Sequence, residues 1–141
     1  MNKLLKFAGA FIMLSMLSAI PSAAQIVDSM TFTTTFAFYV GNAKMPAGTY
    51  TVRPSDIDEN LLQIEDMAKK ASAFIEYTPM HADSPHKATE TTFKKYGTTE
   101  FLDQLWVAGQ QFGMQVSPTK VEQKLAKSGA PAAHSVPAKG K

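Results

Sequence analysis

Two histidines and an aspartate lie close together in the segment 81–86. Imidazole nitrogens and carboxylate oxygens are ligands that zinc or copper accepts, so His81, Asp83 and His86 are the candidate metal ligands of this chain. A firm site would also need a third or fourth ligand from elsewhere in the fold. Aspartate, serine and proline also gather in loops for reasons of turn chemistry, and we take a solvated loop as the default interpretation.

Acidic side chains raise two further possibilities, which are calcium binding and carboxylate catalysis. Asp56, Asp58 and Glu59 are spaced somewhat as in a calcium loop, but they lack its turn glycine and its later bidentate glutamate. Paired glycosidase carboxylates must lie about 5–10 Å apart in a cleft, and the sequence does not pair any two. The chain has no Gly-x-Ser-x-Gly elbow, no cysteine and no His-Glu-x-x-His motif. We therefore expect no enzymatic activity and no cofactor.

Aromatic residues recur at positions that face one way along the predicted strands. They either fill a small core or line a cavity for an apolar ligand. In the second case Phe36, Phe38, Tyr50 and Trp106 are the candidate ligand-binding residues. A barrel of about eight strands can hold one small ligand and fewer strands leave less room, so the packed core is the favoured interpretation.

The elements that must position these residues are short strands. From 30 to 40, apolar or aromatic residues mostly alternate with threonines, which predicts a strand with an aromatic inner face and Tyr39 on the outer face. The segment 100–108 fits a helix or a strand, and we favour a strand that pairs as a hairpin with the segment before it. Further strands are predicted over 49–53, 61–66, 71–78, 87–96 and 111–116.

The C-terminal part combines a helix signal with a segment that lacks any periodicity. A serine-proline pair begins a predicted helix over 117–127, in which Val121 and Leu125 form the stripe that docks on the sheet. Residues 128–141 are rich in alanine, proline, glycine and serine, which predicts a disordered tail. The predicted fold is mainly β, a small antiparallel meander barrel or sandwich of about seven strands with one C-terminal α-helix, in a single domain over 25–127.

The first 24 residues are predicted to be a cleavable secretory signal peptide. Lys3 and Lys6 lead into an uncharged run, Pro21 ends that run, and 22–24 supplies small side chains for a cut before Gln25. An uncleaved anchor is the less favoured alternative, because a spanning helix needs about 20 apolar residues. We therefore expect an exported protein, periplasmic or secreted, that has no membrane span after cleavage.

Composition narrows the function classes further. The chain has no cysteine, which excludes disulfides, thiolate ligands and cysteine nucleophiles. The predicted signal peptide carries two of the 14 basic residues and none of the 12 acidic ones, so the expected mature chain has a net charge near zero. Nucleic-acid binding needs a basic face, and we expect no nucleic-acid partner.

Three segments together resemble a known group of proteins. They are FAFYVGNAKMPAGTY at 36–50, FKKYGTTEFLDQLW at 93–106 and the predicted helix at 117–126. Their order resembles an uncharacterised family of small exported bacterial proteins of acidobacterial type, with a Leu/Met-Pro-Ala-Gly-Thr-Tyr turn and a Tyr-Gly…Phe-Leu…Trp segment. Met45 stands where leucine is expected. The resemblance covers about residues 31–126 and implies export and a single-domain fold, but no activity.

Together these patterns predict an exported, non-catalytic β-domain that binds a protein or a cell-envelope polymer. Binding would use a threonine- and tyrosine-bearing sheet face or an exposed edge strand. The alternative is a small carrier that holds an apolar ligand in an aromatic-lined barrel interior. Both readings leave the oligomeric state open.

We expect the exported chain to begin at Gln25. An Ala24→Lys change removes the small side chain next to the cut, so the precursor should stay uncleaved, whereas Val27→Ala should be processed normally. The measurement is the intact mass of the chain recovered from the exported fraction of producing cells. A wild-type chain that still carries residues 1–24 would contradict the prediction.

Overall fold

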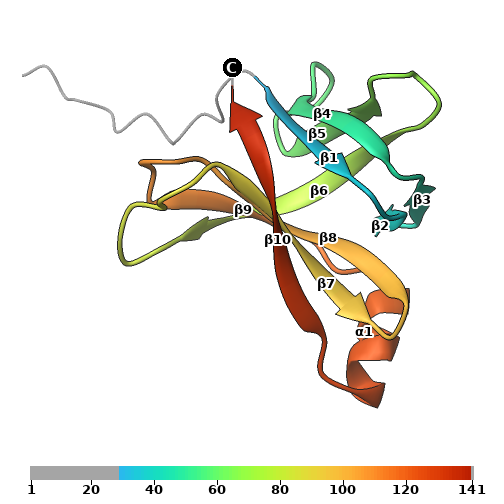
Figure 1. Ribbon diagram of the computed structural model, residues 1–141. Helices are drawn as coiled ribbons and strands as arrows, with labels where there is room; N and C mark the ends of the chain where they lie inside the picture. The colour runs from blue at the N-terminus through green and yellow to red at the C-terminus, as the bar shows by residue number, and fades with distance from the viewer. Residues whose placement is uncertain (1–28, 141) are drawn as a thin grey trace, which may run out of the picture.

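The computed structural model describes residues 29–140, and the predicted signal peptide lies outside these residues. Within this range ten strands form one sheet that closes on itself, and one helix lies between the last two strands (Figure 1). The predicted fold class, a mainly β antiparallel barrel with one helix near the C-terminus, is confirmed. No helix in the described range is long and apolar enough to cross a membrane.

Eight strands form the closed ring of the barrel. Their order around it is β8-β7-β10-β1-β4-β5-β6-β9, and antiparallel pairing of β9 with β8 completes the circle. The remaining two strands form the β2–β3 hairpin, which joins β8 through a short parallel pairing of Tyr39 with Phe101. The strands are β1 (Met30–Thr34), β2 (Phe38–Val40), β3 (Ala43–Met45), β4 (Gly48–Pro54), β5 (Leu61–Asp66), β6 (Ser72–His81), β7 (Glu90–Tyr96), β8 (Thr99–Trp106), β9 (Phe112–Val116) and β10 (Ala132–Gly140), with α1 at Lys120–Ser128.

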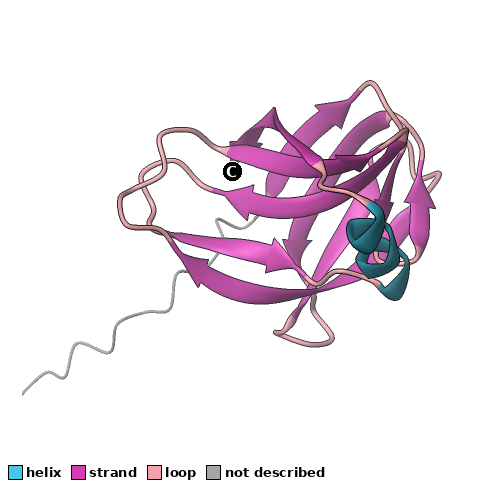
Figure 2. Ribbon diagram, turned by 90° about the horizontal axis from the view of Figure 1, so that it is seen from below, coloured by secondary structure: helices cyan, strands magenta, loops and turns pink. Residues whose placement is uncertain are grey.

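Two long strands connect the two halves of the barrel. Residues 72–76 of β6 pair with β5, whereas residues 77–81 pair with β9. In the same way β10 pairs with β7 over 132–137 and with β1 over 138–140. Strands that change sheet along their length form the corners of orthogonally packed barrels. Figure 2 shows α1 at one end of the barrel and two long loops at the opposite end.

The interior is filled by side chains that alternate along the strands. Side chains of a strand point alternately to its two sides, so every second residue of β1, β4, β5 and β9 enters the core. Nine strands contribute at least one buried residue to the core cluster, and β10 is the one strand of the ten that contributes none. Closure of the ring therefore depends on a strand that adds little to the hydrophobic core.

The predicted single strand over 30–40 is in fact two strands. A bend at residues 35 and 36 separates β1 from β2. The two strands have different partners, since β1 pairs with β4 and β10 whereas β2 pairs with β3 and β8. The predicted inner face survives the bend because Phe32 and Phe38 are both buried. The ambiguous segment 100–108 is a strand, β8, as favoured.

The prediction of a disordered tail over 128–141 is wrong for most of that segment, because residues 132–140 form β10. Its composition gave no strand signal, since its side chains need not be buried when backbone pairing with β7 and β1 holds it in place. The described sheet thus has ten strands, three more than the seven expected.

The helix differs from its prediction over 117–127. Thr119, not Ser117, is the N-cap, and its hydroxyl oxygen accepts a hydrogen bond from the Glu122 amide at 3.2 Å. Ser117 still belongs to the sheet, because its amide donates to a carbonyl of β6. Val121, which was expected to dock, is 57% exposed, and Glu122 is buried in its place.

Gly113 of β9 lies directly opposite Trp106 of β8. A Cβ atom at Gly113 would stand 2.6 Å from Cε3 of the indole, closer than real Cβ contacts allow. The indole therefore lies flat over β9 only because position 113 is glycine.

We expect Gly113→Ala to lower the free energy of unfolding by about 1–3 kcal/mol, because the indole must leave its place over the strand. Chemical denaturation followed by circular dichroism measures this change. The matched control is Gly129→Ala, where nothing lies within 4 Å of the added methyl group and little change is expected. Equal unfolding midpoints for the two variants would show that the contact is not tight.

Candidate functional site

The four predicted ligand-binding residues divide between two places. Phe38 and Tyr50 are fully buried in the core, with their ring centroids 5.1 Å apart. Phe36 is half-buried and packs edge-on against Phe93 at 5.1 Å. Phe38 and Tyr50 thus lie in the core and Phe36 packs against it, whereas Trp106 lies outside the core cluster.

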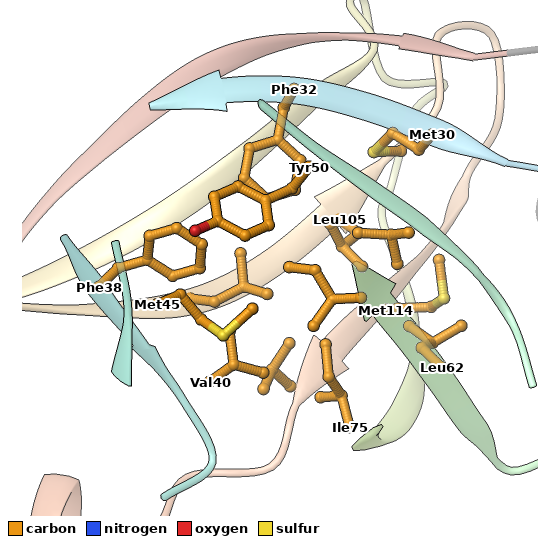
Figure 3. Packing of buried hydrophobic residues seen from close by; sticks show 14 of the residues in the cluster. Met30, Phe32, Phe38, Val40, Met45, Tyr50, Leu62, Ile75, Leu105 and Met114 are labelled. Atoms are coloured by element: carbon orange, nitrogen blue, oxygen red, sulfur yellow. The ribbon is translucent and has the colours of Figure 1, made fainter. Parts of the chain in front are cut away.

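The interior aromatic residues pack directly against one another. The ring centroids of Phe32 lie 5.8 Å from Tyr50, 6.1 Å from Phe38 and 6.1 Å from Phe93. Figure 3 shows the rings of Phe32, Tyr50 and Phe38 side by side, surrounded by aliphatic and methionine side chains. The Tyr50 hydroxyl donates to the Pro46 carbonyl, and burial, with the charge of Asp66 adding to it, raises the pKa of Tyr50. This arrangement is that of a packed core.

A β-bulge explains why Trp106 lies outside the core. Phe93 pairs with Leu102 and Thr92 pairs with Gln104, so Asp103 is an extra residue in β8. Beyond the bulge the inward position moves from even to odd numbers, and Leu105 enters the core in place of its neighbour. Simple alternation from Leu102 therefore puts the tryptophan on the wrong face.

The predicted metal ligands do not come together. Within residues 29–140, no group of three or more histidine, aspartate or glutamate side chains is placed to hold a metal ion. His81 lies edge-on against Phe112, with ring centroids 4.9 Å apart. His86 instead stacks on Trp106, and its Nε2 lies 2.7 Å from Oε1 of Glu90. His81 at the end of β6 and His86 in the following loop thus each pack on an aromatic ring.

Trp106 is enclosed between two groups on the outer side of β8 and β9. Gly113 lies against one side of the indole, and the His86 ring stacks on it with centroids 4.7 Å apart and planes 10° apart. Its Nε1 donates to Oε1 of Gln104 at 2.9 Å. The tryptophan is only 6% exposed, so it is a structural anchor for the loop that carries His86.

A chain of polar groups continues from this indole across the outer face. Gln104 Nε2 donates to Oε1 of Gln115 at 3.0 Å, and Gln115 Nε2 donates to Oδ1 of Asp103 at 2.7 Å. The same Asp103 oxygen lies 3.0 Å from Nζ of Lys94. Burial lowers the pKa of Lys94, but the hydrogen bond and charge of Asp103, together with the charges of Glu122 and Tyr96, outweigh burial, so the pKa of Lys94 is raised. The pKa of Glu122 is also raised, mainly by burial. The positive charge of Lys94 lowers this pKa, and the negative charge of Asp103 raises it.

The buried carboxylates of Asp103 and Glu122 both interact electrostatically with Lys94. Asp103 and Glu122 are both buried, and the ammonium of Lys94 is the cation that lies nearest to Asp103. Buried carboxylates need such partners, because desolvation of an unpaired charge is costly. Glu122 lies in the first turn of α1, so its charge interaction with Lys94 connects the helix electrostatically to β7.

His134 is the residue that sequence reasoning missed. It lies in the segment 128–141 that was predicted to be a disordered tail, yet its Nε2 lies 2.7 Å from Oε2 of the buried Glu100. Its ring stacks on Phe93 at 5.7 Å and meets Phe36 edge-on at 5.2 Å. The signal available was a weak alternation in which 134, 136 and 138 face inward.

The outer side of β1, β4, β5 and β6 carries a polar surface, which we call the threonine face; Thr33 at its centre is exposed, and Thr31, Thr49 and Thr51 are half-buried. Its centre consists of outward side chains on two paired strands, in which Thr31 lies opposite Thr51 and Thr33 opposite Thr49. The hydroxyl oxygens of Thr33 and Thr49 are 2.9 Å apart. Tyr39, the other predicted contact residue, is not here, because it is half-buried and stacks on Phe101.

One margin of the threonine face combines charged, amide and aromatic groups. Arg53 lies opposite Gln63, and Gln63 lies opposite Phe74 on the next strand. The Arg53 guanidinium donates to Oε1 of Gln63 at 2.7 Å, and Glu65 stands beside Thr51. Phe74 is 51% exposed. An exposed aromatic ring thus stands next to the Gln63 amide, with β5 between it and the threonines of β4.

The chain was compared with known proteins. It matches no protein-family model, no curated protein and no solved structure. The resemblance to the acidobacterial-type exported family therefore stays a prediction, and no residue role comes from another protein.

We expect His86→Ala to expose the indole of Trp106, which is the one tryptophan of the chain. Its emission should move to longer wavelength and become more accessible to acrylamide, and stability should fall by about 0.5–1.5 kcal/mol with loss of the stack. His81→Ala is the control, since His81 packs on Phe112 and should leave the emission unchanged. The same spectrum for wild type and His86→Ala would rule out the stack in solution.

Proposed function

We propose that this protein is an exported, non-catalytic β-barrel domain that binds a protein or a cell-envelope polymer through the threonine face. The observation that carries the proposal is the ordered array of Thr31, Thr33, Thr49 and Thr51, on a face that also carries the exposed ring of Phe74 two strands away from β4. The array lies on paired strands of a closed barrel, so its hydroxyl groups keep a fixed spacing.

The chemistry of this face suits a neutral, hydroxyl- or amide-bearing partner. Each threonine hydroxyl can donate one hydrogen bond and accept others. β-Branched side chains are stiff at χ1, so little rotamer freedom is lost when a partner binds. Lys139 and Arg53, which pairs with Asp56, bring positive charge to the border of the array, and Glu65 brings negative charge. Neither sign dominates, which does not favour a strongly charged polymer.

The face is a better candidate than an edge strand. The free end of the described sheet is β3, which is three residues long and carries the exposed Lys44. Short strands and lysine are devices that protect an edge from further pairing. Binding by strand addition at this edge is therefore disfavoured relative to binding on the face.

The carrier alternative has less support from the geometry. An apolar ligand would have to separate Phe38 and Tyr50, whose rings are already in contact and 0% exposed. A depression at the β5–β6 turn is lined by Glu65, Lys69 and Lys70, and such a polar lining is unlike that of sites for apolar ligands.

A binding assay with two face variants tests the proposal. Thr33→Lys adds a charge to the array, and Phe74→Ala removes the exposed ring; each should weaken binding about tenfold or more, as loss of a central contact does. The measurements are co-sedimentation with purified cell-wall polysaccharide and surface plasmon resonance against isolated envelope proteins.

The matched control is Asn42→Lys, which adds the same charge at an exposed position in the β2–β3 turn, away from the face. It should bind as wild type does. If Asn42→Lys weakens binding as much as Thr33→Lys, the threonine face is not the binding surface.

A further inference from the structure

β10 closes the barrel without contributing a buried side chain. It is the one strand of the ten in which no residue is fully buried. Val136 and Ala138 pack against the core from this strand, and both are small and half-buried. Figure 1 shows β10 running from the α1 end of the molecule to the start of β1. Hydrophobic burial therefore contributes less to holding β10 than to holding its neighbours.

The contacts that hold β10 can be made equally well by the β10 of another copy of the chain. Its backbone pairs with β7 over 132–137 and with β1 over 138–140. Pro137 stands within the pairing with β7 and has no amide hydrogen to donate. The one strong side-chain anchor is His134, which meets Glu100 and the ring of Phe93. Any segment with the same sequence would make all of these contacts.

The two strands that flank β10 form a slot with strong β character. β1 and β7 consist largely of threonine and aromatic residues, and each buries a phenylalanine in the core. Without β10 each would present a row of unpaired amide and carbonyl groups, which is a template for another strand. The slot therefore offers backbone pairing partners on both sides to a copy of β10.

A short connection leads from α1 into β10. Residues 129–131 form it, and an added side-chain atom at Gly129 would meet nothing within 4 Å. An element on a short connection can exchange between copies by domain swapping, because the connection alone has to change conformation.

We propose that the slot between β1 and β7 accepts β10 of a second copy of this chain, so that two molecules form a strand-exchanged dimer. The exchange is reciprocal, with each copy donating its own β10 and receiving that of its partner, as a two-fold symmetric dimer requires. Every contact of β10 is then kept. The free-energy cost of the exchanged form consists of the entropy lost on association and any strain in the connection. This proposal does not depend on the proposed function.

Single-cysteine variants can test the exchange directly, because the chain has no cysteine of its own. Thr31 lies opposite Lys139 in the β1–β10 register. Opposite residues of antiparallel strands have Cα atoms about 4.5–5.5 Å apart, which a disulfide spans. Thr31→Cys and Lys139→Cys chains are mixed at high concentration, held near the unfolding midpoint, returned to native conditions and oxidised.

The expected result is a covalent heterodimer joined through positions 31 and 139, identified by mass spectrometry of the linked peptides. The control mixture pairs Lys139→Cys with Thr51→Cys, whose cysteine lies one strand further away on β4. The first mixture should give a severalfold higher heterodimer yield than the control. Equal yields in the two mixtures would overturn the proposal.

A second pair keeps the test valid if a variant of the first pair folds poorly. Thr92 lies opposite Ser135 in the β7–β10 register, on the other side of the slot. A mixture of Thr92→Cys with Ser135→Cys should also give the heterodimer. Size-exclusion chromatography of the untreated wild type should show a dimer fraction that grows with concentration and incubation time, and a strictly monomeric profile after the same incubation would again overturn the exchange.

Discussion

The fold depends on an aromatic cluster that holds the two sides of the barrel together. Phe32 of β1 and Tyr50 of β4 meet Phe38 of β2 and Phe93 of β7, and all four side chains are at most 2% exposed. Each such ring buries about 150–250 Å², and a favourable ring pair adds about 0.5–1.5 kcal/mol. Without disulfides, packing of this kind must replace a covalent connection between strands that are distant in the sheet.

Much of the fold could be predicted because strand periodicity reports on burial. The inward positions of β4 and β5, such as Val52 and Ile64, follow the alternation of the sequence. The break between β1 and β2 was not visible, since Phe32 and Phe38 keep the same parity on both sides of it. β10 was missed for the opposite reason: backbone pairing with β7 and β1 holds it, and this pairing leaves only the weak alternation at 134, 136 and 138 in the sequence.

Less of the candidate site could be predicted, because it depends on geometry between strands. One extra residue in β8 reverses the faces of Trp106 and Leu105, and nothing in the local sequence marks this bulge. The two histidines of the 81–86 segment separate because each finds its own aromatic partner. The outward threonines of β1 could be predicted from the alternation within that strand. Their position opposite the threonines of β4, such as Thr31 opposite Thr51, depends on the register between the two strands, which the sequence does not show.

The threonine face and β10 are neighbours, which links the two proposals without making them equivalent. Lys139 of β10 stands beside Thr31, so the occupant of the slot borders the array. An exchanged β10 has the same sequence and restores the same border, so the affinity of one face stays unchanged. Strand exchange changes the number of threonine faces in one assembly, from one in the monomer to two in the dimer. A dimer with two faces would bind a repetitive envelope polymer more tightly than a monomer, because the second contact forms at a high effective concentration. Strand exchange would then control avidity through protein concentration alone, while each binding surface keeps its structure.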